Sequence, residues 1–409
     1  MREYARERAD AAAEMAELGR RHTEFFAGWA CDRKMTDYKQ WVETELANVR
    51  VALQWCKSNL DEQHPLQIQI ATWEWHLIFG VRQYLQYFGY IHEADAIGQH
   101  LFKHRHWLTP VNHVNFLTML SDELWLFSND VAQESVNRMQ TTIDEGLALM
   151  NESYYLAGQS WFWMCLGSLK LWENKWDEAW HCTQTAYDLG RRALYEPNLV
   201  QLKPNSNTEL INKTPHNGSY RVSANHALAS ATQQAATMLE FQGNYAAALP
   251  YIEESIALKR LEGTASVLLR RLLGYGRILL GLARRTEAVA AWVEALQLIQ
   301  NAHSQIETPY ALFSVTQMMI VDEEWVIAAR WMSAADTFRR GTGMFNAPMI
   351  SERFNHTVTQ IQAFIADADI AAAWEVGKLL THEQALDEML AMLTAAQTAE
   401  VLAQLAART

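Results

Sequence analysis

Glycine and proline are scarce in this chain of 409 residues, which has 18 glycines and 8 prolines. These residues interrupt helices and form the tight turns of β-rich folds, so their scarcity disfavours a fold of many short strands. Nearly half of the residues (49%) are apolar, which is enough for a large buried core and excludes an intrinsically disordered chain. The composition therefore predicts a long all-α protein.

The chain also lacks an apolar run of about 18 residues, the length that a membrane-spanning helix needs. The N-terminal sequence MREYARERADAAAEMAEL carries charges throughout, without the apolar stretch of about 7 to 15 residues typical of a signal peptide. The four cysteines are far apart in the sequence, unlike the close pairs of zinc or redox motifs; they are Cys31, Cys56, Cys165 and Cys182. We expect a cytoplasmic protein with free thiols and no membrane partner.

Basic residues are outnumbered by acidic ones, 34 to 47, which gives a net charge of −13. A broad negative balance opposes binding to a phosphate backbone. Direct contact with nucleic acid is therefore not expected.

One helical pattern of small and bulky residues recurs along the chain. A small residue is followed by a bulky one four positions on, a second small one seven positions on and a bulky one ten positions on. The clearest copies are Ala179–Thr183–Ala186–Leu189, Ala248–Ile252–Ser255–Leu258, Ala288–Trp292–Ala295–Leu298 and Ala328–Met332–Ala335–Phe338. The step from 248 to 288 to 328 is 40 residues each time, and a further copy begins at Met139, 40 residues before Ala179.

A second helix precedes each copy. Twelve residues before the first alanine of each copy lies a residue that is small or short, namely Gly167, Ala236, Gly276 or Thr316. A small residue on each helix of a pair lets the two backbones approach closely and antiparallel. Each pair leaves apolar surface that only the next pair can cover, which is the logic of a solenoid.

The longer step between 179 and 248 indicates an insertion. Residues 195–220 are rich in Pro, Asn, Gly and Lys and have no periodicity, which predicts a loop. The predicted organisation is an N-terminal helical segment (1–60), a first half-array (61–194), this loop (195–220), a second half-array (221–340) and C-terminal capping helices (341–409).

These helix pairs resemble the tetratricopeptide repeat, although its period is about 34 residues and HEAT and armadillo repeats run to about 40 to 47. The small residue on the first helix and the paired small residues on the second favour the tetratricopeptide family with lengthened helices. The resemblance implies an all-α, right-handed superhelix of helix hairpins.

Both ends of the chain resemble a more particular family, the sensor regions of bacterial NB-ARC (STAND-type) ATPase transcriptional regulators. The residues that carry this likeness are Trp41, Glu45, Asn48, Val49, Arg50, Ala52, Leu53 and Trp55 near the N-terminus, and Ala334, Ala335, Gly341, Pro348, Ala373, Trp374, Gly377 and Ala385 near the C-terminus. No phosphate-binding loop GxxxxGK[ST] occurs in the sequence, so the ATPase module is absent, and no basic recognition helix for DNA is found. The chain is therefore interpreted as the sensor half of a split regulator, an excised piece or a free-standing relative.

The sequence offers no catalytic constellation, and we expect neither an enzyme nor a cofactor. His100 and His104 share a helix face, but without a placed carboxylate a metal site is disfavoured. In the segment WFW the helical period places Trp163 on the core side with Leu166 and Gly167, and leaves the environment of Trp161 open.

Function is expected on the surface of the first helices, which line the concave groove in the resembled family. The positions beside the packing face are Trp161, Ser168, Gln233, Thr237, Arg270, Arg277, Tyr310 and Gln317. Arginine forks, amides and aromatic planes suit carboxylates, peptide groups or sugar rings. The favoured function is a non-catalytic sensor and protein-interaction scaffold that binds a protein segment or small effector there and signals to an ATPase partner. Two alternatives stay open: a merely solvated groove, and a receptor whose enclosed pocket for a sugar or metabolite is lined by Trp161 and Tyr310.

Overall fold

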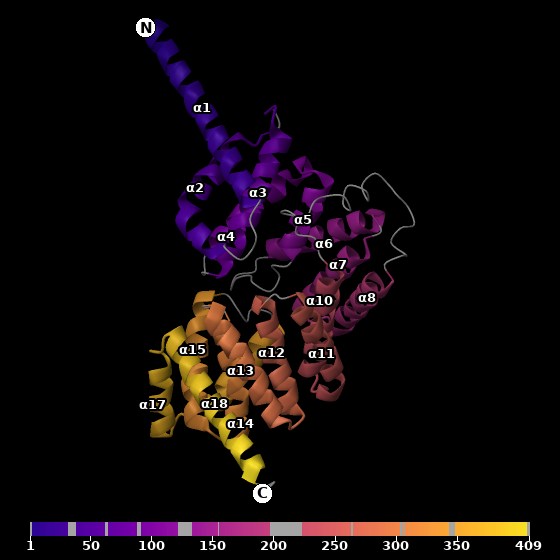
Figure 1. Ribbon diagram of the computed structural model, residues 1–409, viewed down its shortest axis with the longest axis vertical. Coiled ribbons are helices and arrows are strands. Elements are labelled where there is room, and N and C mark those ends of the chain that lie inside the picture. Colours follow the sequence, from indigo (N-terminus) through magenta and orange to yellow (C-terminus); the bar gives the residue numbers. More distant parts are fainter. Residues whose placement is uncertain are drawn as a thin grey trace. The chain divides into compact units, whose positions relative to one another are not determined.

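The computed structural model describes residues 2–31, 38–61, 64–87, 91–121, 133–153, 155–196, 223–262, 265–302, 305, 307–342 and 348–406. Within these ranges every regular element is a helix and no strand occurs. Consecutive helices pack against one another as neighbouring pairs (Figure 1). The predicted all-α fold of stacked helix hairpins is therefore confirmed.

The chain divides into two compact units, which are described separately. Unit 1 comprises Met1–Leu120 and Lys203–Arg221, and unit 2 comprises Ser121–Leu202 and Val222–Thr409. The predicted segment boundaries at 60/61, 194/195, 220/221 and 340/341 stay predictions. Apart from Tyr195 and Glu196, the predicted loop 195–220 lies outside the described residues.

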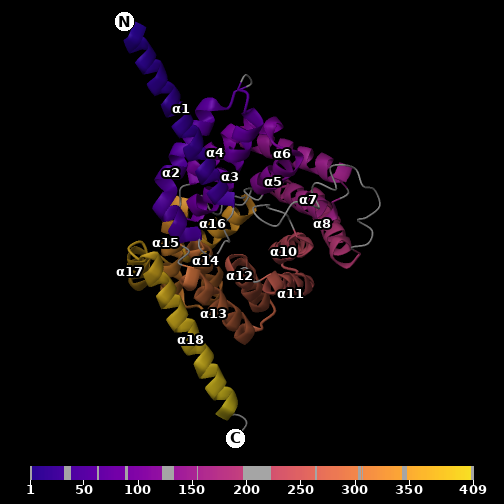
Figure 2. The same cartoon turned by 45° about the horizontal axis from the view of Figure 1, so that its top comes forward.

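Unit 1 is built from α1 (Arg2–Cys31), α2 (Tyr38–Asn59), α3 (Gln67–Tyr87), α4 (Ile91–His104), the short 3₁₀ helix η2 (Arg105–Trp107) and α5 (Pro110–Ser121). Its core contains the fully buried Trp75, whose ring meets Phe116 edge-on at 5.8 Å. Trp55 of α2 lies over Gly19 of α1, where a Cβ atom would stand 2.5 Å from the indole. Trp55 thus packs α2 closely against α1. The N-terminal part of α1 extends beyond the other helices of unit 1 (Figures 1 and 2).

Unit 2 contains α6 (Gln133–Ser153), α7 (Leu156–Trp172), α8 (Trp176–Tyr195), α10 (Ala224–Phe241), α11 (Tyr245–Glu262), α12 (Ala265–Gly281), α13 (Arg285–Ala302), α14 (Thr308–Val321), α15 (Trp325–Thr342), α16 (Pro348–Gln362), α17 (Ala368–Gly377) and α18 (His382–Ala406). Four hairpins repeat within it: α7/α8, α10/α11, α12/α13 and α14/α15. We call α7, α10, α12 and α14 the first helices and α8, α11, α13 and α15 the second helices.

The predicted repeat register holds in all four hairpins. The first alanines of the pattern lie on the second helices and are fully buried; they are Ala179, Ala248, Ala288 and Ala328. The small residues twelve positions earlier are buried on the first helices. At Gly276 a Cβ atom would stand 2.2 Å from the indole nitrogen of Trp292, so only glycine fits there. The small residues at these positions therefore allow the two helices of each hairpin to approach closely.

The turns between paired helices share one backbone geometry. The residue five positions before each buried alanine has positive φ: Asn174 (60°), Gly243 (73°), Ala283 (58°) and Glu323 (59°). The N–H of the next residue donates to the carbonyl five residues back, as in Lys175 to Lys170 (2.8 Å) and Arg284 to Leu279 (2.9 Å). The first helix ends at this residue, whose left-handed conformation reverses the chain direction before the second helix begins.

No helix in the described part of the chain is long and apolar enough to cross a membrane.

The left-handed turn residue predicts a stabilising substitution. Ala283→Gly should raise the free energy of unfolding by about 0.5 to 1 kcal/mol, because glycine adopts positive φ without the clash of a Cβ atom. The matched control is Ala290→Gly in the exposed face of α13, which should lower the free energy of unfolding by about 1 kcal/mol. Urea denaturation measures both values, and equal destabilisation by the two changes would contradict the strain assigned to residue 283.

Candidate functional site

The eight residues predicted to line a binding groove all lie on first helices of unit 2, but they differ in exposure. Trp161, Ser168 and Arg277 are buried, at 1%, 8% and 5% exposure. The other five are half-buried: Gln233 and Thr237 on α10, Arg270 on α12, and Tyr310 and Gln317 on α14. We call the side of α10, α12 and α14 that carries these five residues and Arg277 the first-helix face.

Arg277 is the centre of a buried polar network that joins three successive first helices. Its Nε and Nη2 donate to the two carboxylate oxygens of Glu240 on α10, at 2.7 and 3.0 Å. Its Nη1 donates to Ser314 Oγ (2.6 Å) and its Nη2 also donates to the hydroxyl of Tyr310 (3.0 Å), both on α14. Every arm of the Arg277 guanidinium is engaged inside the protein, and a contact of Arg277 with a ligand stays a prediction.

Charge pairing sets the ionisation of this network. Burial alone would raise the pKa of Glu240, but Arg277 and Arg353 outweigh it and hold that pKa below its usual value. Burial would lower the pKa of Arg277, yet Glu240 and Tyr310 raise it above its ordinary value. The pair is therefore fully ionised at neutral pH.

A second ion pair links α12 to the start of α14. Arg270 Nε and Nη2 both approach Glu307 Oε1, at 2.7 and 2.6 Å. Glu307 is only 2% exposed, and its Oε2 has no hydrogen-bond partner within the described residues. Arg270 is one third exposed, so it is the more accessible of the two arginines of this face.

The two predicted residues on α7 are parts of packing clusters. Ser168 Oγ accepts from Gln234 Nε2 at 2.7 Å, and Thr183 donates to the other end of the same amide at 2.9 Å. Trp161 packs its ring 5.0 Å from that of His226. Lys259 Nζ lies 2.6 Å from His226 Nδ1, and burial, followed by the charges of Lys259 and Arg271, lowers the pKa of His226 to about 3.

In WFW the expectation for Trp163 is corrected, and the question left open for Trp161 is answered. Trp161 is buried, whereas Trp163, predicted to be in the core, is half-buried and meets His181 edge-on at 6.5 Å. The physical reason is that α10 as well as α8 packs on α7, which covers the side of α7 that carries Trp161. Trp161 packs against His226, whereas Tyr310 accepts from Arg277, so the two side chains have different partners, and a pocket lined by both stays a prediction.

The sequence predicted C-terminal capping helices over 341–409, but not that one of them, α16, lies against the first-helix face. Arg353 of α16 donates to Glu240 Oε1 on α10 (2.8 Å), and Thr357 of α16 accepts from Gln317 on α14 (3.4 Å). Figure 2 labels α16 beside α14. A signal was present in the sequence, because Met349, Arg353, Thr357 and Ile361 recur every four residues. Their partners, however, are distant in sequence.

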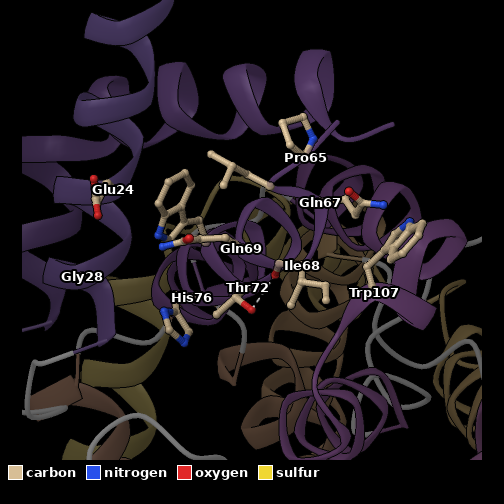
Figure 3. A pocket seen from close by; sticks show the side chains of 11 residues that line it. Glu24, Gly28, Pro65, Gln67, Ile68, Gln69, Thr72, His76 and Trp107 are labelled. Atoms are coloured by element: carbon tan, nitrogen blue, oxygen red, sulfur yellow. Dashed lines mark hydrogen bonds between the residues drawn. The ribbon is translucent and has the colours of Figure 1, made fainter. Parts of the chain in front are cut away.

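A pocket of about 900 Å³ lies in unit 1 (Figure 3). Its floor is one face of α3, with Ile68, Thr72 and His76 at intervals of four residues. Glu24 and Gly28 of α1 line one side, and Trp107 lines the other. The walls combine aromatic, aliphatic, amide and hydroxyl groups, which is typical of small-molecule sites. The four-residue spacing along α3 is the sequence signal that could have found it.

His100 pairs with a buried carboxylate. Its Nδ1 lies 2.8 Å from Glu74 Oε1, and Glu74 is fully buried. Burial raises the pKa of Glu74, and the hydrogen bond with His100 opposes that rise. The described residues hold no group of three or more His, Cys, Asp or Glu side chains arranged to bind a metal ion.

The stacked hairpins define the class of the protein, a helical-repeat protein. No family model matches the chain, and no match is found among curated proteins. Among solved structures the chain is similar to aspartyl phosphate phosphatase F from Bacillus subtilis, with 11% identity over 93% of this chain and 94% of that chain and a TM-score of 0.39. A similarity this low carries no argument about function.

The ion pair of Arg277 gives a prediction on stability and its dependence on pH. Arg277→Met should lower the free energy of unfolding by about 3 kcal/mol at pH 7, because Glu240 loses its main partner while it stays buried. In the wild type the folded pKa of Glu240 is depressed, so the stability from this pair is present at neutral pH and is lost as the pH falls through that pKa.

In the Arg277→Met variant only Arg353 opposes the effect of burial on Glu240, so the pKa of this carboxyl should rise and the difference in stability from wild type should shrink as the pH falls from 7 to 4. Urea denaturation at both pH values measures it. The control is Arg284→Met, which removes a solvent-exposed pair with Glu287 and should leave the free energy of unfolding nearly unchanged. A difference between wild type and Arg277→Met that stays constant with pH would contradict the assignment.

Proposed function

We propose that the protein is a non-catalytic helical-repeat scaffold that binds a protein segment on the first-helix face of unit 2. The observation that carries this proposal is a set of half-buried polar side chains held in one register on three successive first helices. Helical-repeat proteins commonly bind partners on extended surfaces of this kind, because each repeat contributes the same positions.

Two features of the first-helix face suit a peptide. The side chains of Gln233 and Thr237 make no hydrogen bond within the described part of the chain, so their amide and hydroxyl groups can pair with a peptide backbone. Arg270 is one third exposed and pairs with Glu307, so a positively charged group lies at the surface of this face.

The buried network below this face supplies rigidity. Glu240, Arg277 and Ser314 connect α10, α12 and α14 without intervening solvent. Side chains above such a network lose less conformational entropy on binding, which favours affinity.

The role in the cell follows from the family resemblance at the two ends of the chain. We place the protein in the cytoplasm of a bacterium as the sensor part of an NB-ARC-type signal-transduction or transcriptional regulator. Binding of a protein segment or small effector would select one arrangement of the hairpins, and an ATPase partner would read it. Among the residues of the resemblance, Ala335, Ala373 and Trp374 are buried and serve packing, whereas Asn48 and Arg50 are exposed.

The test is peptide selection followed by substitution on the first-helix face. Peptides of about 15 residues are selected by phage display on the purified protein, and their affinity is measured by fluorescence anisotropy. Gln233→Arg and Thr237→Arg, which fill the face with long charged side chains, should each weaken binding at least 10-fold. The matched control Gln297→Arg makes the same change at an exposed position of α13 and should leave affinity unchanged.

Binding that withstands both Gln233→Arg and Thr237→Arg would place the peptide elsewhere and refute the proposed face. Far-UV circular dichroism confirms that the variants keep their helical content.

A second candidate function is a small-molecule receptor, and the pocket of unit 1 favours it. The pocket volume of about 900 Å³ falls within the range of ligand sites. Gly28 offers a direct test, because a Cβ atom at this position would meet no atom within 4 Å. A larger side chain there can enter the pocket without disturbing α1.

A panel of monosaccharides, amino acids and nucleosides is screened by the shift that each causes in the melting temperature. The receptor function predicts that at least one compound stabilises the wild type and Gly28→Ala but not Gly28→Trp. The absence of any stabilising compound, or an equal response of Gly28→Trp, would rule out this pocket as the ligand site.

A further inference from the structure

Helix α16 lies across the first-helix face instead of extending the stack of hairpins. The next helix to pack extensively on α15 is α17, not α16. Three separate contacts join α16 to first helices, near the C-terminal ends of α7 and α10 and in the middle and last turns of α14.

The first contact is apolar. Met349, in the first turn of α16, packs against a small cluster that includes Leu171 of α7 and Met238 of α10. These residues are separated from Met349 by more than a hundred positions. A helix that followed α15 in the regular stack would not reach them.

The second contact is ionic. Arg353 Nη1 donates to Glu240 Oε1 at 2.8 Å, and its guanidinium lies 5.0 Å from the ring centre of Phe241. Arg353 remains 24% exposed, whereas Glu240 is 1% exposed. The face therefore offers a buried carboxylate and an aromatic ring to an arginine that arrives from outside.

The third contact combines stacking with a hydrogen bond. Phe354 is fully buried and stacks on Phe313 of α14 with ring centres 5.5 Å apart. One turn later Thr357 pairs with Gln317, a residue of the first-helix face. Ile361 then joins the main core of unit 2.

The first-helix face can survive without α16. Glu240 would keep both hydrogen bonds from Arg277, so departure of Arg353 leaves the buried carboxylate paired. Within α16 the fully described buried residues are only Phe354, Thr357 and Ile361, fewer than on the helices of the hairpins. The helix is also held by Ile350 and Val358 against the core and by Arg339 of α15, which lies over the Phe354 ring and donates to Asn355. An amphipathic helix bound in a groove is held by a similar set of apolar and charged anchors.

We propose that α16 is an exchangeable occupant of the first-helix face, and that the partner is an amphipathic helix with the same anchors. This inference rests on the proposed function. The partner helix has the same pattern as α16. An apolar residue corresponds to Met349, and four positions later comes an arginine with an aromatic residue directly after it, like Arg353 and Phe354. A hydroxyl residue and an aliphatic residue follow four and eight positions after the arginine, like Thr357 and Ile361. It binds the face that α16 vacates, so α16 acts as a built-in competitor.

The experiment uses the full chain and a fluorescein-labelled peptide of residues 348–362. In the wild-type chain the tethered α16 has a large effective concentration and should exclude the peptide. Arg353→Glu in the chain places a second carboxylate beside Glu240 and should release the tethered helix. Fluorescence anisotropy should then show peptide binding at least 10-fold tighter than to the wild type.

Two controls fix the interpretation. Arg340→Glu makes the same charge reversal at an exposed site on α15 and should leave binding as in the wild type. A peptide with Arg353→Ala and Phe354→Ala should bind the Arg353→Glu chain at least 10-fold more weakly than the natural peptide. If Arg353→Glu lowers helical content, Phe354→Ala in the chain gives the same readout by removing the stacked ring.

Failure of both released chains to bind the peptide, with helical content kept, would overturn the proposal, and so would equal binding of the two peptides. A display-selected peptide separates this inference from the proposed function. If Gln233→Arg abolishes its binding but Arg353→Glu leaves its affinity unchanged, the first-helix face is a binding site and exchange of α16 is refuted.

Discussion

The structure of unit 2 depends on the close approach of two helices at one small residue per hairpin. At Gly276 the indole of Trp292 occupies the space that any side chain would need. The four alanines of the second helices are fully buried at the same position of each hairpin. Because a tight turn with one left-handed residue joins each pair, the spacing and direction of the helices are fixed together. This packing therefore also fixes how the side chains of the first-helix face are aligned from one first helix to the next.

That register explains why charged and polar partners recur 37 residues apart, although the hairpins repeat every 40. Glu240 pairs with Arg277, Arg277 with Ser314, and Arg270 with Glu307, each across 37 residues. A residue on one first helix contacts a residue on the next first helix that lies about one helical turn before its equivalent position in the repeat. Its partner is therefore about 3 residues short of 40, or 37 residues away. The polar network is therefore a consequence of the stacking, and it ties three first helices into one surface.

The sequence was enough to predict the repeated hairpins, but not the contacts that the residues of the first-helix face make. Small residues at fixed spacing predict hairpins because the helical period and the short turn are local properties. The burial of Trp161 depends on α10, which packs on α7 from beyond an insertion. Arg277 was predicted to face a ligand, but its carboxylate partner becomes visible only when sequences one repeat apart are compared. The contact of Arg353 with Glu240 spans 113 residues and follows no repeat. The pocket of unit 1 has a local signal along α3, but its walls come from α1 and Trp107.

The first-helix face lies over a buried polar network, and α16 packs on it within the same chain. Such a face is suited to regulated binding, because the residues that contact α16 can also contact a partner helix. Hydrogen–deuterium exchange of the full chain, with and without a saturating peptide that binds the first-helix face, tests this account most directly. The account predicts that amides of residues 348–362 lose protection when the peptide binds, while those of α10 and α14 keep or gain it. Unchanged protection of residues 348–362 in the saturated complex would contradict it.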